Sequence, residues 1–454
     1  MTIVEHKWSA LPVPYAMEVV DRVRKERYYD PDFYAMEAEL IWPRVWQMAC
    51  RLEEIPEVGD CAEYKILDQS VIVLRTPDEG VRAFYNVCRH RGVQLVQGRG
   101  SRRGGFVCPF HGWCYGTDGH NTRVTQEATF SSENLRPPDL DLTPVRCEAW
   151  GGCAWINLDD DAPPLRACLE PIADVLDAWM VDSLRAEWWY ACRLPVNWKL
   201  AQEAFVEQYH VLQAHPQLRI PGRFPARNPA DFDPRVFVGG ELEYLQTMSD
   251  GMAGMVHARD VQIARQLADV ELPADYGLAS AAWDRQLNDA VVRAYRARGC
   301  AMPDLNELAE QGLNEPMAYC FPHYFVLPML SSASSYRFRP LGPEETLMDM
   351  WSLTRFPAGE EPPTPPVPEP WEHDDPRWPP IPAQDFSNLP RQQRGLHARS
   401  FEYMRLSERN EGHISNYQRV IDGFLAGLPY ETLLPALRKI NVNPLEMPVV
   451  EIAF

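Results

Sequence analysis

Short β-rich runs separated by turn residues fill positions 46 to 158 and predict a small all-β module. Gly and Asp break this stretch into segments that include Glu63–Leu67, Ser70–Arg75 and Val81–Val87. We interpret Ala149–Asn157 as the closing strand. The Asp- and Pro-rich run at 159–164 then predicts a linker.

A second, larger domain is expected over residues 165–454, where longer elements begin. The pattern predicts a helix at Leu165–Trp179, a strand at Trp188–Leu194 and a further helix in the run of good helix formers Asn197–His210. Two more strands are expected at Ser335–Arg339 and Thr346–Phe356. Mixed helices and strands in one domain, next to an all-β module, predict an α+β protein.

Two other stretches are read from composition alone. The segment from about 359 to 384 is rich in Pro and acidic residues, which exclude a central strand or helix, so we expect a surface excursion. Residues 1–45 mix polar and aromatic side chains and include a predicted helix at Phe33–Trp42. Between 217 and 335 no motif is recognised, and Met248, Met252, Met255 and Tyr324–Leu327 fit a core better than a pocket.

Charge and hydropathy narrow the function classes. The chain has 454 residues, 45% of them hydrophobic, with 44 Lys and Arg against 64 Asp and Glu and a formal charge of -20. This balance disfavours nucleic acid or an anionic membrane as the partner. Since no apolar run approaches the roughly twenty residues of a spanning helix and no signal pattern is present, we expect a cytoplasmic protein. Eleven Cys without repeated spacing fit reduced thiols.

The first chemical motif is a pair of Cys and His residues on two neighbouring loops. Cys88-x-His90 is followed, after seventeen residues, by Cys108-x-x-His111. Two thiolates and two imidazoles are the ligands of a Rieske [2Fe–2S] centre, whose potential exceeds that of a four-Cys cluster, so the motif predicts an electron relay. Structural zinc, or no metal, is the alternative, although zinc modules usually pair Cys with Cys and His with His.

The second motif lies in the helix-forming run. Glu203, Glu207 and His210 fall on one face of the predicted helix, and His215 follows just before Pro216. The residue before Pro is biased away from the helical region, so we place His215 just past the helix end, where both imidazoles can reach one ion. Two His and one carboxylate leave open positions on a non-haem Fe(II).

The two motifs together resemble the Rieske non-haem iron aromatic-ring-hydroxylating oxygenases, and specifically their α subunits. The resemblance rests on the Cys/His pairs, the following Gly112-Trp113-x-Tyr115, and Asn-Trp-Lys before Glu-x3-Glu-x-Tyr-His-x4-His-Pro. Ala204 departs from the Asn of many relatives. The resemblance implies a helix-grip (START/Bet v1-like) catalytic domain with an antiparallel sheet, a long C-terminal helix at His397–Leu428, and an N-terminal segment packed on it.

The resemblance also assigns roles to residues. His90 and His111 would bind one cluster iron and Cys88 and Cys108 the other. His210, His215 and Asp385 would hold the catalytic iron. Asp385 is chosen because it precedes Gln393-Arg394-Gly395-Leu396, although Pro390, which lies between them, argues against a continuous helix. Glu408 and Glu411 are the alternative candidates for the third iron ligand. Glu207 would bridge His210 to a cluster His of the adjacent subunit.

The implied activity is that of a terminal oxygenase that uses O2 and electrons from NAD(P)H. No Gly-x-Gly-x-x-Gly follows a strand, so a separate reductase, with or without a ferredoxin, is expected. The expected assembly is a homotrimer of α chains, with or without a small β subunit, acting on an aromatic or other apolar ring. Dihydroxylation, monohydroxylation and demethylation remain open. The alternative is a Rieske electron carrier or ligand-binding protein without oxygenase activity.

Overall fold

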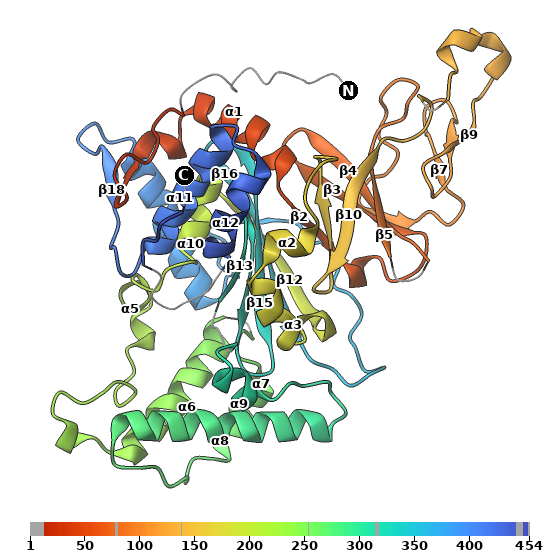
Figure 1. The fold of residues 1–454 in the computed structure, drawn as a ribbon. Coiled ribbons are helices and arrows are strands. Elements are labelled where there is room, and N and C mark those ends of the chain that lie inside the picture. The colour runs from red at the N-terminus through yellow and green to blue at the C-terminus, as the bar shows by residue number, and fades with distance from the viewer. Residues whose placement is uncertain are drawn as a thin grey trace. The chain divides into compact units, whose positions relative to one another are not determined.

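The computed structural model describes residues 13–77, 80–137, 139–252, 254–313, 317–441 and 448–452. These residues form two compact units (Figure 1): one spans residues 37–168, and the other combines residues before 37 with those from 169 onward. Each unit is described by itself.

The unit at 37–168 is built from antiparallel strands, as predicted. A seven-stranded sheet has the order β2-β11-β10-β5-β4-β3-β6, and a three-stranded sheet has the order β7-β8-β9. The strands are β2 (Gln47–Arg51), β3 (Asp60–Ile66), β4 (Gln69–Arg75), β5 (Val81–Tyr85), β6 (Arg99–Ser101), β7 (Phe106–Val107), β8 (Cys114–Tyr115), β9 (Asn121–Arg123), β10 (Pro144–Trp150) and β11 (Cys153–Asn157).

The predicted closing strand is wrong in one respect. Ala149–Asn157 contains the end of β10 and all of β11, which pair antiparallel as a hairpin. Gly151 and Gly152 adopt positive φ angles of 63° and 72°, which place the turn between the two strands. The apolar residues on both sides of the two Gly had merged into one run in the sequence pattern.

The second unit is organised around a six-stranded sheet with the order β13-β14-β15-β16-β12-β17. Every pair in it is antiparallel except β12 with the edge strand β17. The strands are β12 (Arg185–Leu194), β13 (Ala318–Cys320), β14 (Tyr324–Pro328), β15 (Ala333–Gly342), β16 (Glu345–Thr354) and β17 (Trp371–Glu372). The antiparallel core of the sheet agrees with the predicted helix-grip domain.

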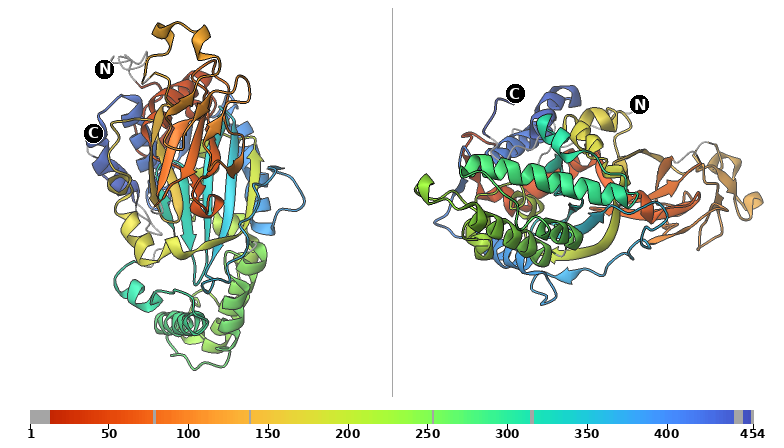
Figure 2. Two further views of the ribbon diagram at one scale, coloured as in Figure 1. Left: turned by 90° about the vertical axis from the view of Figure 1, so that its right-hand side faces the viewer. Right: turned by 90° about the horizontal axis from the view of Figure 1, so that it is seen from below.

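Helices accompany this sheet. A helical group at one end of it is visible in Figures 1 and 2. That group consists of α6 (Pro234–Gly251), α7 (Ala258–Arg265), α8 (Tyr276–Ala297) and α9 (Leu305–Glu310). The remaining helices of this unit include α3 (Ile172–Ala178), α4 (Trp198–Glu203), α5 (Val211–Ala214), α10 (Pro380–Leu396), α11 (Gly412–Leu425) and α12 (Tyr430–Ile440).

Three predicted helices are shorter than the sequence pattern suggested. The run Leu165–Trp179 divides into α2 (Leu165–Leu169) and α3, with Pro171 between them. His397–Leu428 is not one helix, because β18 (Tyr403–Arg405) and a turn precede α11. Within that turn the Glu411 carboxylate accepts the Ser407 N–H, which closes the chain before α11 begins.

The third of these helices carries the candidate metal ligands. The predicted helix Asn197–His210 ends at Glu203, the last residue of α4. The N–H groups of Phe205 and Val206 bond to carbonyls three residues back, a tightening that ends the helix. Glu207 and His210 therefore do not share a helix face with Glu203, and the chain re-enters helix only at α5.

The Pro-rich stretch at 359–384 is largely irregular, but its last five residues belong to α10. Pro380 stands in the first turn of α10. Proline is tolerated there because backbone N–H groups in the first turn have no acceptor within the helix. The N-terminal segment packs on this unit: β1 (Arg22–Arg24) pairs with β18, and the Arg27 guanidinium bonds to Gln418 and Asp422 of α11.

Gly105 provides a test of the β unit. Its φ is +88°, and a Cβ there would collide with the carbonyl oxygen of Tyr115 in β8. We expect Gly105→Ala to destabilise the protein by about 2 kcal/mol or more, since both backbone strain and a steric clash are added. Thermal unfolding measures the loss. Gly104→Ala is the matched control, because nothing lies within 4 Å of its Cβ; equal stability of the two variants would contradict the packing described.

Candidate functional site: a Cys/His pair of loops and a His/His/Asp centre

The two Cys/His loops have the same backbone hydrogen bonds. The Cys88 N–H donates to the Val93 carbonyl at 2.8 Å and the Gly92 N–H to the Cys88 carbonyl at 3.0 Å. The second loop repeats these bonds from Cys108 to Trp113 and from Gly112 to Cys108, with the same two distances. Gly92 and Gly112 both have positive φ angles, of 78° and 72°, which the tight turns require. Two equivalent loops thus present one Cys and one His each.

The two thiols are buried but differ electrostatically. Burial raises the pKa of Cys88, although the Tyr115 hydroxyl lies 3.2 Å from its Sγ. Burial acts in the same sense on Cys108, but the N–H groups of His111 and Phe110 outweigh it and lower the pKa of that thiol. Backbone donors directed at sulfur favour the thiolate, which is the form that binds iron.

The two imidazoles lie beside each other, with ring centroids 4.6 Å apart. His90 stacks on Trp113 at 5.0 Å and meets the edge of Phe130 at 5.7 Å. Its Nδ1 is buried and has no hydrogen-bond partner. A buried ring nitrogen without a partner, next to two sulfurs that favour thiolate, fits an iron–sulfur cluster.

The donor spacing also bears on the zinc alternative. Ligand atoms of one Zn²⁺ lie about 2.0–2.3 Å from it, so any two are at most about 4.6 Å apart. Within the described part of the chain, the only three His, Cys, Asp or Glu donors all within 4.8 Å of one another belong to His210, His215 and Asp385. The donors of the Cys/His loops are not part of such a group, and a two-iron cluster, whose ligands are divided between two metal ions, does not require one.

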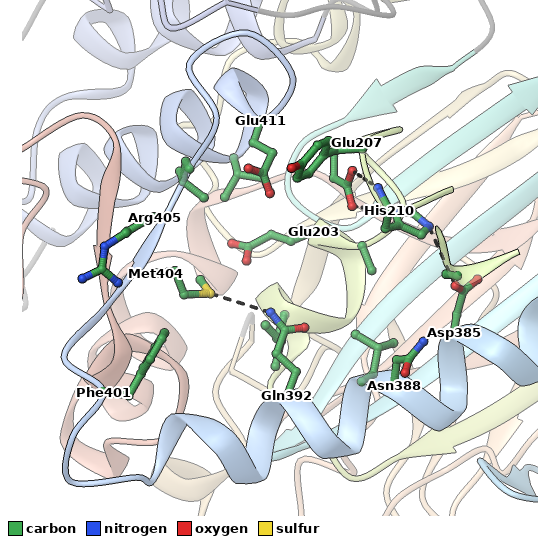
Figure 3. A pocket seen from close by; sticks show the side chains of 17 residues that line it. Glu203, Glu207, His210, Asp385, Asn388, Gln392, Phe401, Met404, Arg405 and Glu411 are labelled. Carbon is green, nitrogen blue, oxygen red and sulfur yellow. Dashed lines mark hydrogen bonds and ion pairs between the residues drawn. The ribbon is translucent and has the colours of Figure 1, made fainter. Parts of the chain in front are cut away.

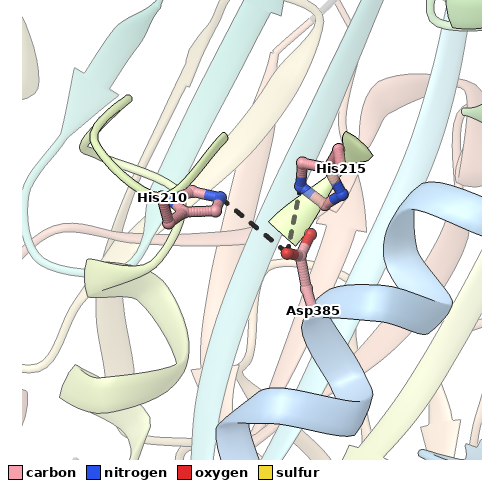
Figure 4. Close-up of side chains that lie close together, drawn as sticks. All are labelled: His210, His215 and Asp385. Carbon is pink, nitrogen blue, oxygen red and sulfur yellow. Dashed lines mark ion pairs between the residues drawn. The ribbon is translucent and has the colours of Figure 1, made fainter. Parts of the chain in front are cut away.

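The second centre brings together His210, His215 and Asp385, as Figure 4 shows. His210 precedes α5 and His215 follows it directly, in agreement with the prediction that His215 lies just past a helix end. The Oδ1 atom of Asp385, from α10, lies 3.2 Å from Nε2 of His215 and 3.8 Å from Nε2 of His210. Three donors from two distant segments thus face one point.

Each imidazole is held through its other nitrogen. Nδ1 of His210 lies 2.5 Å from Oε1 of Glu207, and Nδ1 of His215 lies 2.7 Å from Oε1 of Gln384. Because these oxygens accept, each Nδ1 carries the proton and each Nε2 keeps its lone pair for a metal. The side chain of Gln384 is itself fixed by two hydrogen bonds with Gln217.

Electrostatics favour a cation at this centre. Burial alone lowers the pKa of His210, but the hydrogen bond that the ring donates to the Glu207 carboxylate outweighs it, and the pKa is raised. His215 behaves in the same way, with Asp385 as the carboxylate that raises its pKa. Carboxylates that stabilise positive charge on the rings would equally stabilise a divalent ion in their place. The neutral imidazoles and one carboxylate fit the donor set of a non-haem iron.

The reserve carboxylates do not join this group. Glu408 and Glu411 are absent from the described donor cluster, and the Glu411 carboxylate caps Ser407 instead. α10 forms despite Pro390, which removes the doubt about the helix that carries Asp385. Sequence reasoning gave Gln384 no role. The sequence feature that could have indicated this role is its position directly before Asp385. On one helix, Asp385 supplies a metal donor and Gln384 orients the imidazole of His215.

A cavity of about 360 Å³ opens beside this centre (Figure 3). Its wall includes Glu203, Glu207, His210 and Asp385. Glu203 is fully buried, and burial raises its pKa to about 7. Its carboxylate accepts hydrogen bonds from the Tyr28 hydroxyl and the Gln418 amide, so it braces the N-terminal segment and α11 instead of joining the metal donors.

Two protein families match the chain. Residues 45–136 match the Rieske [2Fe-2S] domain, and residues 181–427, more than half of the chain, match the ring hydroxylating alpha subunit (catalytic domain). The fold and the two centres thus define a Rieske protein with a catalytic domain of the ring-hydroxylating type. The chain belongs to the family of Rieske oxygenase α subunits, and with it come one Rieske cluster and one mononuclear iron.

Curated relatives have differing activities. The carnitine monooxygenase oxygenase subunit of Escherichia coli K12 is 32% identical over 194 residues, 42% of this chain and 50% of that protein. The large oxygenase component of a 2,4-dinitrotoluene dioxygenase system from Burkholderia sp. is 30% identical over 60% of this chain and 61% of its own. The chain thus aligns with about half to three-fifths of the length of these relatives.

Solved structures share the fold. A naphthalene 1,2-dioxygenase variant bound to phenanthrene superposes with a TM-score of 0.62 at 20% identity, over 94% of this chain and all of its own. A quaternary ammonium Rieske monooxygenase has a TM-score of 0.58 at 18% identity, over 91% of this chain and 98% of its own. Among the described helices, none is long and apolar enough to cross a membrane.

Gln384 offers a test of the metal centre. Gln384→Ala removes the acceptor that orients His215, and we expect iron affinity at this centre to fall about 10- to 100-fold. Anaerobic titration of the iron-depleted protein with Fe(II) gives the affinity. Gln392→Ala, at an exposed position on the same helix, should leave it unchanged. Unaltered affinity in Gln384→Ala would show that His215 needs no such support.

Proposed function

We propose that the chain is the terminal oxygenase component of a Rieske non-haem iron oxygenase system. It uses O2 and electrons from NAD(P)H, delivered by a separate reductase with or without a ferredoxin, to hydroxylate an aromatic or other apolar ring. The observation that carries this proposal is the convergence of two Nε2 atoms and one carboxylate beside a cavity, in a chain that also has the Cys/His loops.

The geometry of the two centres supports the following ligand assignments as part of this proposal. His90 and His111 hold one iron of the cluster, and Cys88 and Cys108 the other. His210, His215 and Asp385 hold the mononuclear iron. When bound, the cluster supplies single electrons and the mononuclear iron activates dioxygen.

The remaining residues of the centre position its ligands. Glu207 and Gln384 keep both imidazoles in the tautomer that leaves Nε2 free. Asp385, which is largely buried, offsets the positive charge of the ion. The short α5 sets the distance between the two rings, whose centroids are 5.6 Å apart.

Glu207 has a further proposed role between subunits. It already accepts from both the backbone N–H and the Nδ1–H of His210. A carboxylate that also accepts from a cluster His of an adjacent subunit would join the two centres electronically, which requires a head-to-tail homotrimer. A small β subunit is compatible with this arrangement. The side chains of Glu207 and His210 are 10% and 26% exposed, so the pair is partly accessible from the protein surface.

The type of reaction depends on which atom of the substrate is held near the iron. Addition of two oxygen atoms to a ring, addition of one, and demethylation all use the same iron ligands, and relatives with monooxygenase and with dioxygenase names both match the chain. Cytoplasmic location and a role in aromatic catabolism belong to the same proposal. A Rieske electron carrier or ligand-binding protein without oxygenase activity would not need the His/His/Asp centre.

Metal analysis tests the two-centre assignment. Protein loaded anaerobically should contain three irons and two sulfides per chain, with the visible spectrum of a Rieske cluster. The double variant His210→Ala/His215→Ala should keep two irons, both sulfides and the colour, and lose all oxygenase activity. Colourless loaded protein, or an active double variant, would refute the assignment.

The variant Glu207→Ala tests whether Glu207 supports His210 and the electron route or only helps to bind the metals. When loaded with excess Fe(II), which offsets any loss of iron affinity, Glu207→Ala should retain both metals but lose product formation at least about 100-fold, since the variant loses the support of His210 and the route between subunits. Iron content, the spectrum of the reduced cluster and product yield per NADH measure this. Glu408→Ala, at a carboxylate outside the donor group, is the control. Wild-type turnover in Glu207→Ala would show that Glu207 is needed neither to support His210 nor to bridge the subunits.

A substrate screen resolves the reaction. With a surrogate reductase and ¹⁸O2, product mass should show one or two incorporated oxygen atoms for an aromatic ring substrate. Oxygen uptake without any product, across aromatic and other apolar rings, would contradict the proposed substrate class.

A further inference from the structure

Two serine hydroxyls face each other on neighbouring strands of the catalytic sheet. Ser334 of β15 is registered opposite Ser352 of β16, and Tyr336 is opposite Met350. Side chains two residues apart on a strand lie on the same face, and opposite residues of an antiparallel pair lie side by side. Ser334, Ser352 and Tyr336 therefore share one face of the sheet.

This face looks toward the metal centre. The ring of Phe205, five residues before His210, packs on Tyr336 at 5.5 Å and on Phe338 at 5.8 Å. Phe338 follows Tyr336 by two residues and so lies on the same face. The Asp385 carboxylate adds to burial in raising the pKa of Tyr336, which places that phenol within electrostatic reach of the centre.

Both serine hydroxyls lack partners. Ser334 and Ser352 are 2% and 0% exposed, and their Oγ atoms make no hydrogen bond. A buried polar group without a partner costs about 1–3 kcal/mol, so two of them side by side are expensive. The Ser334 hydroxyl lies near enough to the Tyr336 phenol to oppose the rise in its pKa, but no hydrogen bond of normal geometry joins them.

The residues registered directly beside the pair are uncharged. Trp188 of β12 is registered opposite Ser352, and Leu327 of β14 is opposite Ser334. Gly254, between α6 and α7, comes close from above: a Cβ there would lie 3.6 Å from Ser352 Oγ. The Glu187 carboxylate lies further along the same strands, but it already accepts the Thr354 hydroxyl and lies 3.7 Å from Nε2 of His257. A buried carboxylate or ammonium at the two hydroxyls would therefore have no free counter-charge.

We propose that Ser334 and Ser352 form a subsite that hydrogen-bonds an uncharged polar substituent, such as a hydroxyl or nitro group, on the ring of the substrate. The inference rests on the proposed oxygenase function and names its substrate class more closely. Hydroxyls can donate or accept, so the pair accommodates either kind of neutral group. The substituent thereby fixes which edge of the ring faces the iron.

Binding to the holoenzyme without O2 or reductant tests the subsite. Toluene, phenol, nitrobenzene and benzoate are the probes, and calorimetry gives the dissociation constants. Wild-type protein should bind phenol and nitrobenzene about 10-fold more tightly than toluene, with benzoate weakest. Ser352→Ala and Ser334→Ala should each weaken phenol binding about 3- to 10-fold and leave toluene unchanged, since each removes one hydrogen bond.

Ser335 supplies a matched control. Its hydroxyl is also buried and without a partner, but it is registered opposite Trp351 and lies on the other face of the sheet. Ser335→Ala should therefore leave all four dissociation constants unchanged. Equal binding of toluene and phenol by the wild type, binding of neither, or an equal effect of Ser335→Ala would overturn the proposal.

Stability provides a second measurement. Without ligand, Ser352→Ala should raise the melting temperature, because it removes an unsatisfied buried hydroxyl; a lower melting temperature would mean that the hydroxyl is structural and would overturn the subsite. Failure of the proposed function would look different. The protein would then lack the third iron or form no oxygenated product, whereas failure of the subsite leaves oxygenation intact without discrimination between probes.

Discussion

The catalytic unit depends on one arrangement, in which each of two imidazoles is fixed through Nδ1 so that both Nε2 atoms face a single carboxylate. Glu207 holds His210 from within its own loop, while Gln384 holds His215 from α10, the helix that also supplies Asp385. One helix therefore delivers both a donor and the group that orients another donor. Asp385 and Gln384 are adjacent on α10, so their positions relative to each other are fixed by the helix itself.

The two Cys/His loops share one backbone geometry but differ in side-chain packing. Identical hydrogen bonds close both turns, yet the two halves differ in environment: His90 is enclosed by Trp113 and Phe130, whereas His111 packs against Phe110, which is 57% exposed. Equal backbone geometry fixes the positions of the four donors, and unequal packing differentiates them. The more accessible side is the one suited to contact with a partner that gives or takes an electron.

Motifs that are local in sequence could be predicted well, since a Cys-x-His loop or a His-x4-His segment carries its own geometry. The extents of helices could not. Propensity favoured a helix through His210, but aromatic packing of Phe205 on the sheet and capture of His210 by Glu207 end it at Glu203. Asp385 was reached only through the resemblance, and Gln384 not at all, because its contact with His215 spans 169 residues of sequence.

The cost of burying polar groups explains where function is concentrated in this unit. Glu203 is buried, like the serine pair, but two donors satisfy its carboxylate, which joins the N-terminal segment and α11. Ser334 and Ser352 are equally buried and have no partners. A satisfied group stabilises the fold, whereas an unsatisfied one destabilises it until something binds. A ligand therefore explains the presence of such a pair on the face that looks toward the metal centre better than folding does, since an unpaired buried hydroxyl lowers the stability of the fold.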